Sequence, residues 1–233
     1  HSLMDMMGLN AVLVAWTTVL CRQEDQVKPF IGFSHDPLAG LKDTKPELLP
    51  KYVFAETLLM GWAWILFALR YIFLVEMFWK YREEERMIFL PRKYMHRMQK
   101  EAMEELAPQT TSDGKPFFVS DGDVLYAWWT SVVLRAGNPS PDRMVNMRST
   151  YCCRSLLADL GHIPSATSAL VTNAVSSTLT FLSVRQILKR PLSFTAAAIR
   201  EALLQQRNEE QFQAYDAIKR DTLDNANHPA LFG

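Results

Sequence analysis

Apolar and polar positions follow one another along the chain in a pattern that predicts a mainly helical protein. Apolar side chains recur three and four residues apart in several stretches, the spacing that gives a helix one buried face. Residues 21–50 interrupt this pattern with four prolines, so they are expected to form a long irregular connection. Helices are expected at about 2–20, 55–81, 93–106, 121–135, 191–206 and 209–223.

Three shorter segments favour extended structure. Residues 144–151 have the pattern of a strand, and residues 173–180 are expected to be partly extended. The apolar run Met87–Pro91 is expected to be a short strand that its proline ends. Ser120 and the acids that follow it are typical of a helix N-terminus, where they cap free N–H groups and oppose the helix dipole.

Residues 58–79 form the most apolar stretch of the chain and raise the question of a membrane helix. The longest uncharged run, Leu58–Leu69, has 12 residues, whereas a spanning helix needs about 20. Arg70 and Glu76 would place charges near the middle of such a span, which is costly in a bilayer. A helix packed against protein is therefore favoured, and a membrane-surface or re-entrant helix stays as the alternative.

The composition narrows the class of protein. Lys+Arg and Asp+Glu number 25 each, so the net charge is zero and neither nucleic acid nor an anionic membrane is indicated as a partner. The cysteines are three, and Cys152 and Cys153 are adjacent. Neighbouring residues on a strand point to opposite faces and make a poor disulfide pair. We therefore expect a reducing, cytoplasmic location.

Motifs for several common chemistries are missing from the sequence. No cysteine and histidine set has the spacing of zinc ligands, so no metal is expected. A glycine-rich phosphate loop and a G-x-S-x-G elbow are also missing. His1 and Asp5 remain, four residues apart, and on a helix they would share one face, so that the carboxylate could orient the imidazole. A neutral imidazole can take a proton near pH 7, but this spacing alone often arises by chance.

Five blocks of sequence add to this pair. They are HSLMDMMG with the following LVAW and FIGFSHDPLAGL, then FVSDGDVLYAWWTSVV, MVNMRSTY, VTNAVSS and PLSFTAAAIREAL. In this order they resemble the HxxxD acyltransferases, which form the BAHD family in plants and a related branch in filamentous fungi. The chain resembles the fungal branch more closely. The blocks cover most of the chain, and together they are far more specific than the histidine and aspartate.

The resemblance implies an α/β (α+β) fold of two lobes like that of chloramphenicol acetyltransferase, of which this chain would hold a helix-rich part. Residues 1–110 would be the end of the first lobe plus the crossover, including the HxxxD helix. Residues 111–233 would be the start of the second, acyl-CoA-side lobe. The sequence lacks the family's DFGWG motif, the strands before HxxxD and an initial methionine. We therefore expect a piece of a longer, monomeric protein, inactive by itself.

The resemblance also implies a transferase that moves an acyl group, acetyl by default, from acyl-CoA to a hydroxyl or amine of a specialised metabolite. His1 would be the general base. Asp5 would be structural and pair with Arg148 of the vNxR-like strand. Gly8 would let the helix pack closely, and Asn173 would line the channel or contact CoA. The partners would be acyl-CoA and a small alcohol or amine, with neither nucleic acid nor membrane.

Two alternatives stay open beside this reading. A truncated, inactive relative with a binding role would keep the same blocks without turnover. Thr172 stands where the family's GNA block has glycine, and this replacement puts the local backbone geometry in doubt. A membrane-associated helical protein would instead account for the apolar residues 58–79.

Overall fold

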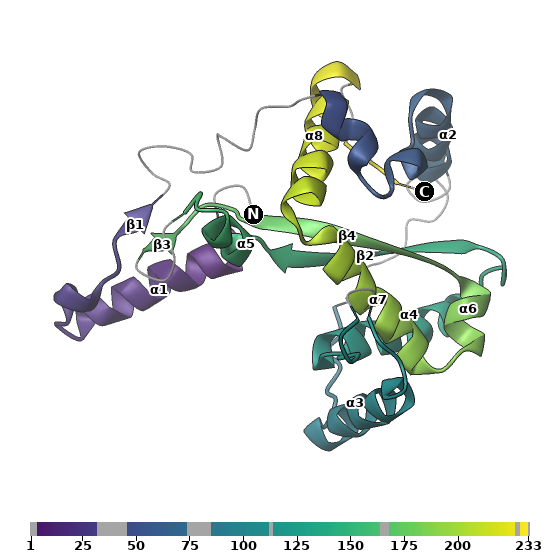
Figure 1. Ribbon diagram of the computed structural model, residues 1–233, viewed down its shortest axis with the longest axis horizontal. Helices are drawn as coiled ribbons and strands as arrows, with labels where there is room; N and C mark the ends of the chain where they lie inside the picture. Colours follow the sequence, from purple (N-terminus) through teal and green to yellow (C-terminus); the bar gives the residue numbers. More distant parts are fainter. Residues whose placement is uncertain are drawn as a thin grey trace. The chain divides into compact units, whose positions relative to one another are not determined.

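Figure 1 shows the computed structural model of the chain, coloured along the sequence. It describes residues 4–31, 46–73, 85–111, 114–163, 168–226 and 229–232. The chain forms two compact units, each built from separate stretches. The first comprises His1–Val53, Arg148–Thr178 and Gln205–Asn227, and the second comprises Phe54–Met147, Leu179–Leu204 and His228–Gly233. The expected division between lobes near residue 110 stays a prediction.

The first unit begins with α1 (Met6–Leu20), whose start is set by Asp5. Asp5 has an extended backbone, with φ −85° and ψ 178°, and its carboxylate accepts the N–H of Gly8 at 2.8 Å. An aspartate here satisfies one of the N–H groups that the first turn leaves without a helical partner. The expected helix therefore begins later than residue 2. Asp5 lies before this helix as its N-cap, and His1 lies outside the described residues, so the shared face expected for the two residues stays untested.

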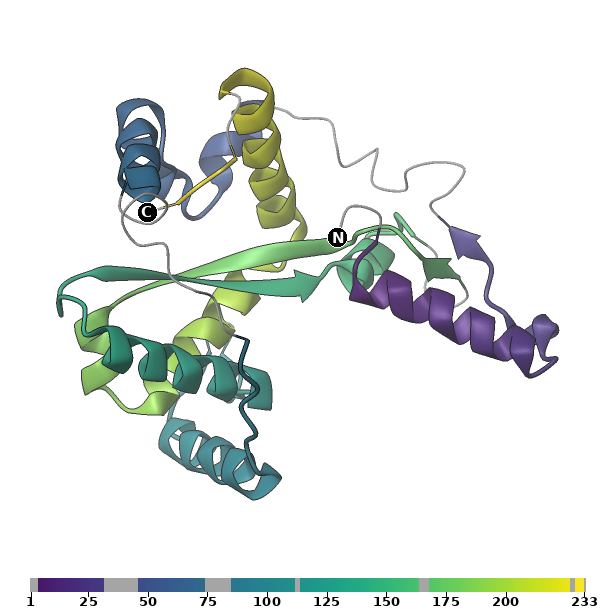
Figure 2. The ribbon, with the colours of Figure 1, turned by 180° about the vertical axis from the view of Figure 1, so that it is seen from behind.

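A small parallel sheet lies beside α1. The strands β1 (Phe30–Ile31) and β3 (Ala169–Leu170) pair with Phe30 opposite Ala169 and Ile31 opposite Leu170. α1 packs against β3, as both views show (Figures 1 and 2). The N-terminal helix is thereby held against a strand far away in the sequence.

The rest of the first unit surrounds the end of a long strand. β2 (Met144–Cys152) and β4 (Val175–Ser183) pair in a two-stranded sheet, and each strand runs from one unit into the other. α5 (Arg154–Asp159) follows β2 directly, and α8 (Glu209–Ala226) packs against the 3-10 helix η3 (Pro46–Lys51). A further 3-10 helix, η1 (Glu24–Gln26), follows α1. One buried apolar cluster of this unit comprises Cys153, Leu157, Ile163, Leu170, Ala174 and Phe212.

The second unit is built from helices around one apolar core. Figure 2 shows α3 and α4 side by side, and they are in contact. Ser120 and Asp123 form a capping box at the start of α4, as the sequence predicts. The helices are η4 (Ala55–Thr57), α2 (Gly61–Tyr71), α3 (Arg92–Leu106), α4 (Asp121–Gly137), α6 (Val184–Lys189) and α7 (Leu192–Gln206). The core includes Met98, Ala102, Leu106, Val119, Val124, Ala127, Met147, Leu182, Ile187, Ala196 and Ile199.

Most of the longer predicted elements are present. The helices α3, α4, α7 and α8 and the strand β2 are confirmed within a few residues of their predicted bounds. The short strand expected at Met87–Pro91 is wrong: these residues have no regular secondary structure. The side chains of Met87 and Phe89 are 98% and 84% exposed. An apolar run becomes a strand only where a neighbouring strand takes up its backbone hydrogen bonds.

The apolar stretch around residues 58–79 forms a helix over only part of its length. α2 covers Gly61–Tyr71, and the remainder of the expected helix from residue 74 lies outside the described residues. None of the residues of α2 is buried, and Trp62 is 78% exposed. Among the described residues, every helix is too short or too polar to cross a bilayer.

Candidate functional site

Asp5 and Arg154 form a buried ion pair at the start of α1. The guanidinium donates through Nη1 to Oδ2 of Asp5 at 2.8 Å and through Nη2 to Oδ1 at 2.9 Å. Only 6% of Asp5 is exposed. Two parallel charge-assisted hydrogen bonds fix both the distance and the orientation of the partners, which a single contact would not. The pair therefore holds the N-terminus of α1 against the start of α5.

Backbone groups complete the surroundings of this pair. The N–H of Ala174 donates to Oδ2 of Asp5 at 2.9 Å, beside the Gly8 contact to Oδ1. Nη2 of Arg154 donates to the carbonyl oxygens of Leu170 at 3.0 Å and Thr172 at 2.9 Å. Both buried charges are thus paired and hydrogen-bonded, the condition under which burying them is tolerable. The connection between β3 and β4 is fastened to α1 and α5 through these contacts.

The electrostatics of the site favour the charged carboxylate. Burial by itself raises the pKa of Asp5, because it disfavours the ion. Hydrogen bonds from Arg154, Ala174 and Gly8 outweigh burial and lower the pKa of Asp5 from 3.8 to about 2. At neutral pH Asp5 is therefore an anion that accepts hydrogen bonds from its neighbours and donates none.

Gly8 lies where α1 comes closest to the backbone beyond β3. A Cβ atom at this position would stand 2.1 Å from the carbonyl oxygen of Val171 and 3.1 Å from Cβ of Met4. The first distance is far below any real contact, and the atom met is backbone, which cannot rotate away. The close packing expected at Gly8 is thus present, and it requires the missing side chain.

Arg148 lies away from Asp5, so the expected pairing of these two residues is wrong. Its Nη2 donates to the hydroxyl of Tyr215 on α8. The ring of Tyr215 packs at 5.3 Å from that of Tyr52, and the Tyr52 hydroxyl donates to Gln206 Oε1 at 3.2 Å. Burial raises the pKa of Tyr52 above its usual range. Because Arg148 lies within β2 and Arg154 follows its end, only Arg154 reaches the start of α1.

The remaining predicted site residues either lie near the Asp5–Arg154 pair or fall outside the residues that the structure describes. His1 lies outside the described residues. Asn173 is half-buried in the connection between β3 and β4. Its neighbours Thr172 and Ala174 contact Arg154 and Asp5 through backbone groups. The role of Asn173 in lining a channel stays a prediction. Within the residues that the structure describes, no group of acids, histidines and cysteines could hold a metal ion.

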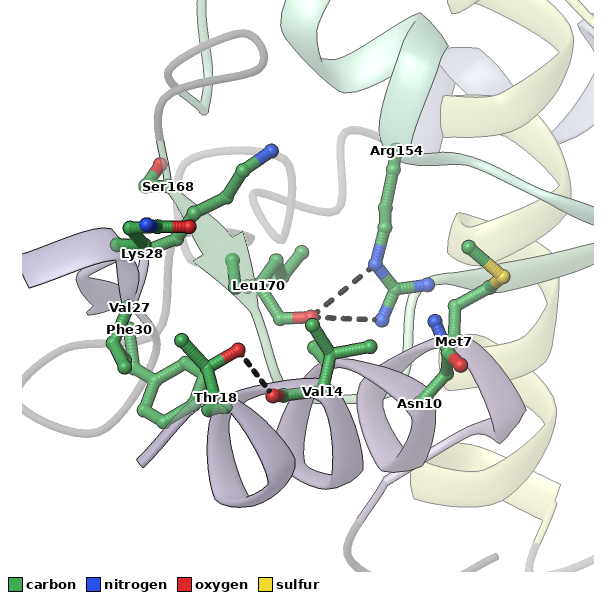
Figure 3. Close-up of a pocket in the computed structure, with 14 residues that line it drawn as sticks. Met7, Asn10, Val14, Thr18, Val27, Lys28, Phe30, Arg154, Ser168 and Leu170 are labelled. Atoms are coloured by element: carbon green, nitrogen blue, oxygen red, sulfur yellow. Dashed lines mark hydrogen bonds between the residues drawn. The ribbon is translucent and has the colours of Figure 1, made fainter. Parts of the chain in front are cut away.

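A cavity of about 300 Å³ adjoins the ion pair on one side of α1 (Figure 3). Its walls come from α1, the segment leading into β1, and β3, and the Arg154 side chain closes one end. The expected site residues Asp5, Gly8, Arg148 and Asn173 are not among the residues that line it. Arg154 itself carries no motif that marks it in the sequence. Only the fold brings it to Asp5, 149 residues away.

The chain resembles two curated fungal proteins along its whole length. It is 66% identical over 234 residues to acetyltransferase sphE of Aspergillus fumigatus. It is 34% identical over 234 residues to transcriptional regulator calD of Penicillium decumbens. The chain spans 45% of the length of each of these relatives. No family model matches the chain.

A solved structure shares the fold. The crystal structure of F. sporotrichioides TRI101 complexed with coenzyme A and T-2 matches with a TM-score of 0.52 at 16% sequence identity. The match covers 93% of this chain and 43% of that one. At this identity the match speaks for the fold alone, and it agrees with a partial, helix-rich version of the expected two-lobe architecture.

Proposed function

Since the chain belongs to the fungal branch of the BAHD-type HxxxD acyltransferases, we propose that the protein transfers an acyl group from acyl-CoA to a hydroxyl or amine of a specialised metabolite. The relative named acetyltransferase, at 66% identity over the whole chain, supports acetyl as the group transferred. A cytoplasmic location is part of the proposal, supported by three free cysteines of which two are adjacent.

The observation that carries this proposal is the buried pair of Asp5 and Arg154. In the family the aspartate of the HxxxD motif is structural, and here its carboxylate accepts four hydrogen bonds and caps α1. Such a residue fixes where the chain enters the helix. His1 precedes Asp5 by four residues in the sequence, and an anchor so close along the chain suits a group that must meet a substrate reproducibly.

The proposed chemistry assigns His1 the role of general base. Its neutral imidazole removes the proton from the acceptor hydroxyl or amine as the oxygen or nitrogen attacks the thioester carbonyl. The carbon–sulfur bond then breaks, and the proton passes from the imidazolium to the departing thiolate, so that free CoA and the acylated acceptor result. An imidazole with a pKa near 6.5 can carry out both transfers near neutral pH. Asp5, as an anchor, takes no part in these proton transfers.

A second candidate function is a binding role without turnover. The relative named transcriptional regulator, at 34% identity, supports it. The same anchor would then hold a ligand-binding scaffold, and loss of His1 would have no consequence for it. The two candidates make opposite predictions about His1.

The test is acyl transfer by the full-length protein, measured as release of the CoA thiol from acetyl-CoA with a panel of alcohols and amines. We expect His1→Ala to lower turnover about a hundredfold or more, while CoA still binds. His96→Ala is the matched control, because His96 is exposed on α3 and contacts Arg92. Turnover by His1→Ala at the wild-type rate would refute the base. CoA binding by a wild-type protein that turns over no acceptor would favour the second candidate.

A further inference from the structure

The segment just before α3 presents apolar side chains to solvent in alternation. Ile88 and Leu90 line a cleft together with residues of α4. Met87 and Phe89 are 98% and 84% exposed, the highest fractions for large apolar side chains among the described residues. Met87 and Phe89 together are called the apolar tip below. The segment thus stays beside α4 while the apolar tip projects into solvent.

α4 extends this apolar surface. Leu125 and Trp129, one helical turn apart, line the same cleft and are 39% and 42% exposed. The segment and α4 both belong to the second unit, so the surface lies on one compact body. A contiguous apolar patch marks a place where a protein meets a partner or a membrane, whereas a single exposed apolar residue does not.

Cations follow the apolar tip at the start of α3. From residue 87 to residue 100 every side chain that is charged at neutral pH is positive and exposed: Arg92, Lys93, Arg97 and Lys100. The first turn of α3 has no acidic residue, and Pro91 before it provides no side-chain cap. Cations at a helix N-terminus oppose the helix dipole, so Arg92 and Lys93, called the cationic turn below, do not stabilise α3.

Acids near the cationic turn do not cancel its charge. Neither Arg92 nor Lys93 forms an ion pair within the part of the chain that the structure describes, and Arg92 donates to the imidazole of His96. The first acid of α3, Glu101, comes nine residues after Arg92. That is about 14 Å along a helix, beyond the screening length of about 8 Å in physiological salt. One exposed acid, Asp121, lies in the first turn of α4. The zero net charge of the whole chain thus conceals a positive end of α3.

We propose that the apolar tip and the cationic turn dock together on the surface of an anionic lipid bilayer. Only two residues separate Phe89 from Arg92, so both groups reach one surface. The apolar side chains enter the boundary of the acyl chains, and the cations meet the lipid phosphates. Trp129 suits the same boundary, because its ring is apolar and its N–H is polar. Such surface attachment needs no membrane-spanning helix and no acyl transfer, so it stands independently of the proposed function.

Co-sedimentation of the full-length protein with lipid vesicles tests this docking. Vesicles of phosphatidylcholine are compared with vesicles that also contain phosphatidylserine. We expect the protein to bind the anionic vesicles more tightly, and the preference to fall as salt is added, because exposed charges are screened. Replacing the cationic turn, by Arg92→Gln together with Lys93→Gln, should weaken binding to the anionic vesicles about tenfold.

A second pair of variants tests the apolar tip. Phe89→Ser should weaken binding about tenfold, because a large apolar side chain no longer leaves water. Leu223→Ser is the matched control, since Leu223 is 55% exposed on α8 of the first unit and should leave binding unchanged. Circular dichroism shows whether each variant keeps its helices.

Three results would overturn the proposal. The first is a wild-type protein that does not sediment with anionic vesicles, as when the remainder of the full-length protein covers the apolar tip. The second is equal binding to vesicles with and without phosphatidylserine, or an unchanged affinity after loss of the cationic turn. The third is equal binding by Phe89→Ser and Leu223→Ser.

Discussion

Asp5 and Arg154 meet in a bidentate ion pair that joins the first helix of the chain to the end of a strand 149 residues later. The same carboxylate caps α1 and pairs with the cation. Removing the Asp5 side chain therefore destroys the helix cap and the ion pair together. The start of α1 and its attachment to α5 therefore both depend on one side chain.

The first prediction concerns the charge of Asp5. Asp5→Asn keeps a side chain that can cap a helix but leaves the Arg154 cation without its anion. Removing one partner of a buried pair costs about 3 kcal/mol or more in free energy of unfolding, measurable by urea denaturation. Asp142→Asn is the control, since Asp142 and Arg185 form a pair that is 79% and 62% exposed. It should cost less than about 1 kcal/mol. Equal effects of the two variants would refute the anchoring role.

The second prediction is a pH dependence with a defined sign. The pKa of Asp5 is lowered from 3.8 to about 2 in the folded protein. Its pairing therefore contributes stability above about pH 4, and this contribution is lost as the pH falls towards 2. The loss amounts to about 2 kcal/mol. The difference in unfolding free energy between wild type and Asp5→Asn should shrink by this amount across that window. A constant difference from pH 5 to pH 2.5 would contradict it.

The third prediction tests the close approach at Gly8. Gly8→Ala must displace the backbone at Val171, because the new Cβ would lie 2.1 Å from its carbonyl oxygen. We expect a loss of about 2 kcal/mol or more in stability. Gly122→Ala in α4 is the control, since its Cβ would lie 3.6 Å from the Ser120 hydroxyl, an ordinary contact. That change should be neutral or stabilising by up to about 1 kcal/mol. A stable Gly8→Ala variant would show that α1 can move.

The fourth prediction concerns the three thiols. Cys21 and Cys152 are exposed, whereas Cys153 is buried, and burial raises the pKa of Cys153 to about 12. Iodoacetamide at pH 8 should therefore alkylate two thiols of the native protein and the third only after unfolding, because the thiolate is the reactive form. Mass spectrometry of peptides identifies the sites. Rapid alkylation of Cys153 in the native state would mean that the core of the first unit opens.

Long elements could be predicted from the sequence, and short ones could not. α4 has an apolar pattern and a Ser120 cap, so both its existence and its start could be foreseen. β1 has two residues and α5 has six, too few for any periodicity to stand out. The strand predicted at Met87–Pro91 is wrong although the local pattern was clear. Its composition suits a strand, but these residues pair with no strand in the described part of the chain.

In the candidate site, too, local features could be predicted from the sequence, whereas contacts between distant segments could not. A structural Asp5 and a close-packed Gly8 could be expected from the resemblance, because both are local features of the motif. The partner of Asp5 could not, because Arg148 and Arg154 lie a few residues apart in the sequence. Which of them reaches Asp5 depends on where β2 ends relative to α1, and that is decided by tertiary packing. The cavity beside α1 could not be foreseen either, since its walls come from three separate segments.

The four hydrogen bonds to Asp5 also limit what a histidine beside it can do. Two carboxylate oxygens offer about four lone pairs, and Gly8, Ala174 and the two arms of Arg154 occupy that number. No lone pair is left to hold an imidazole in the way that the aspartate of a catalytic triad does. An imidazole at this place would have to take its tautomer from a backbone carbonyl, a water molecule or the substrate. Any redesign that aims for a triad here would first have to give Arg154 a different anion.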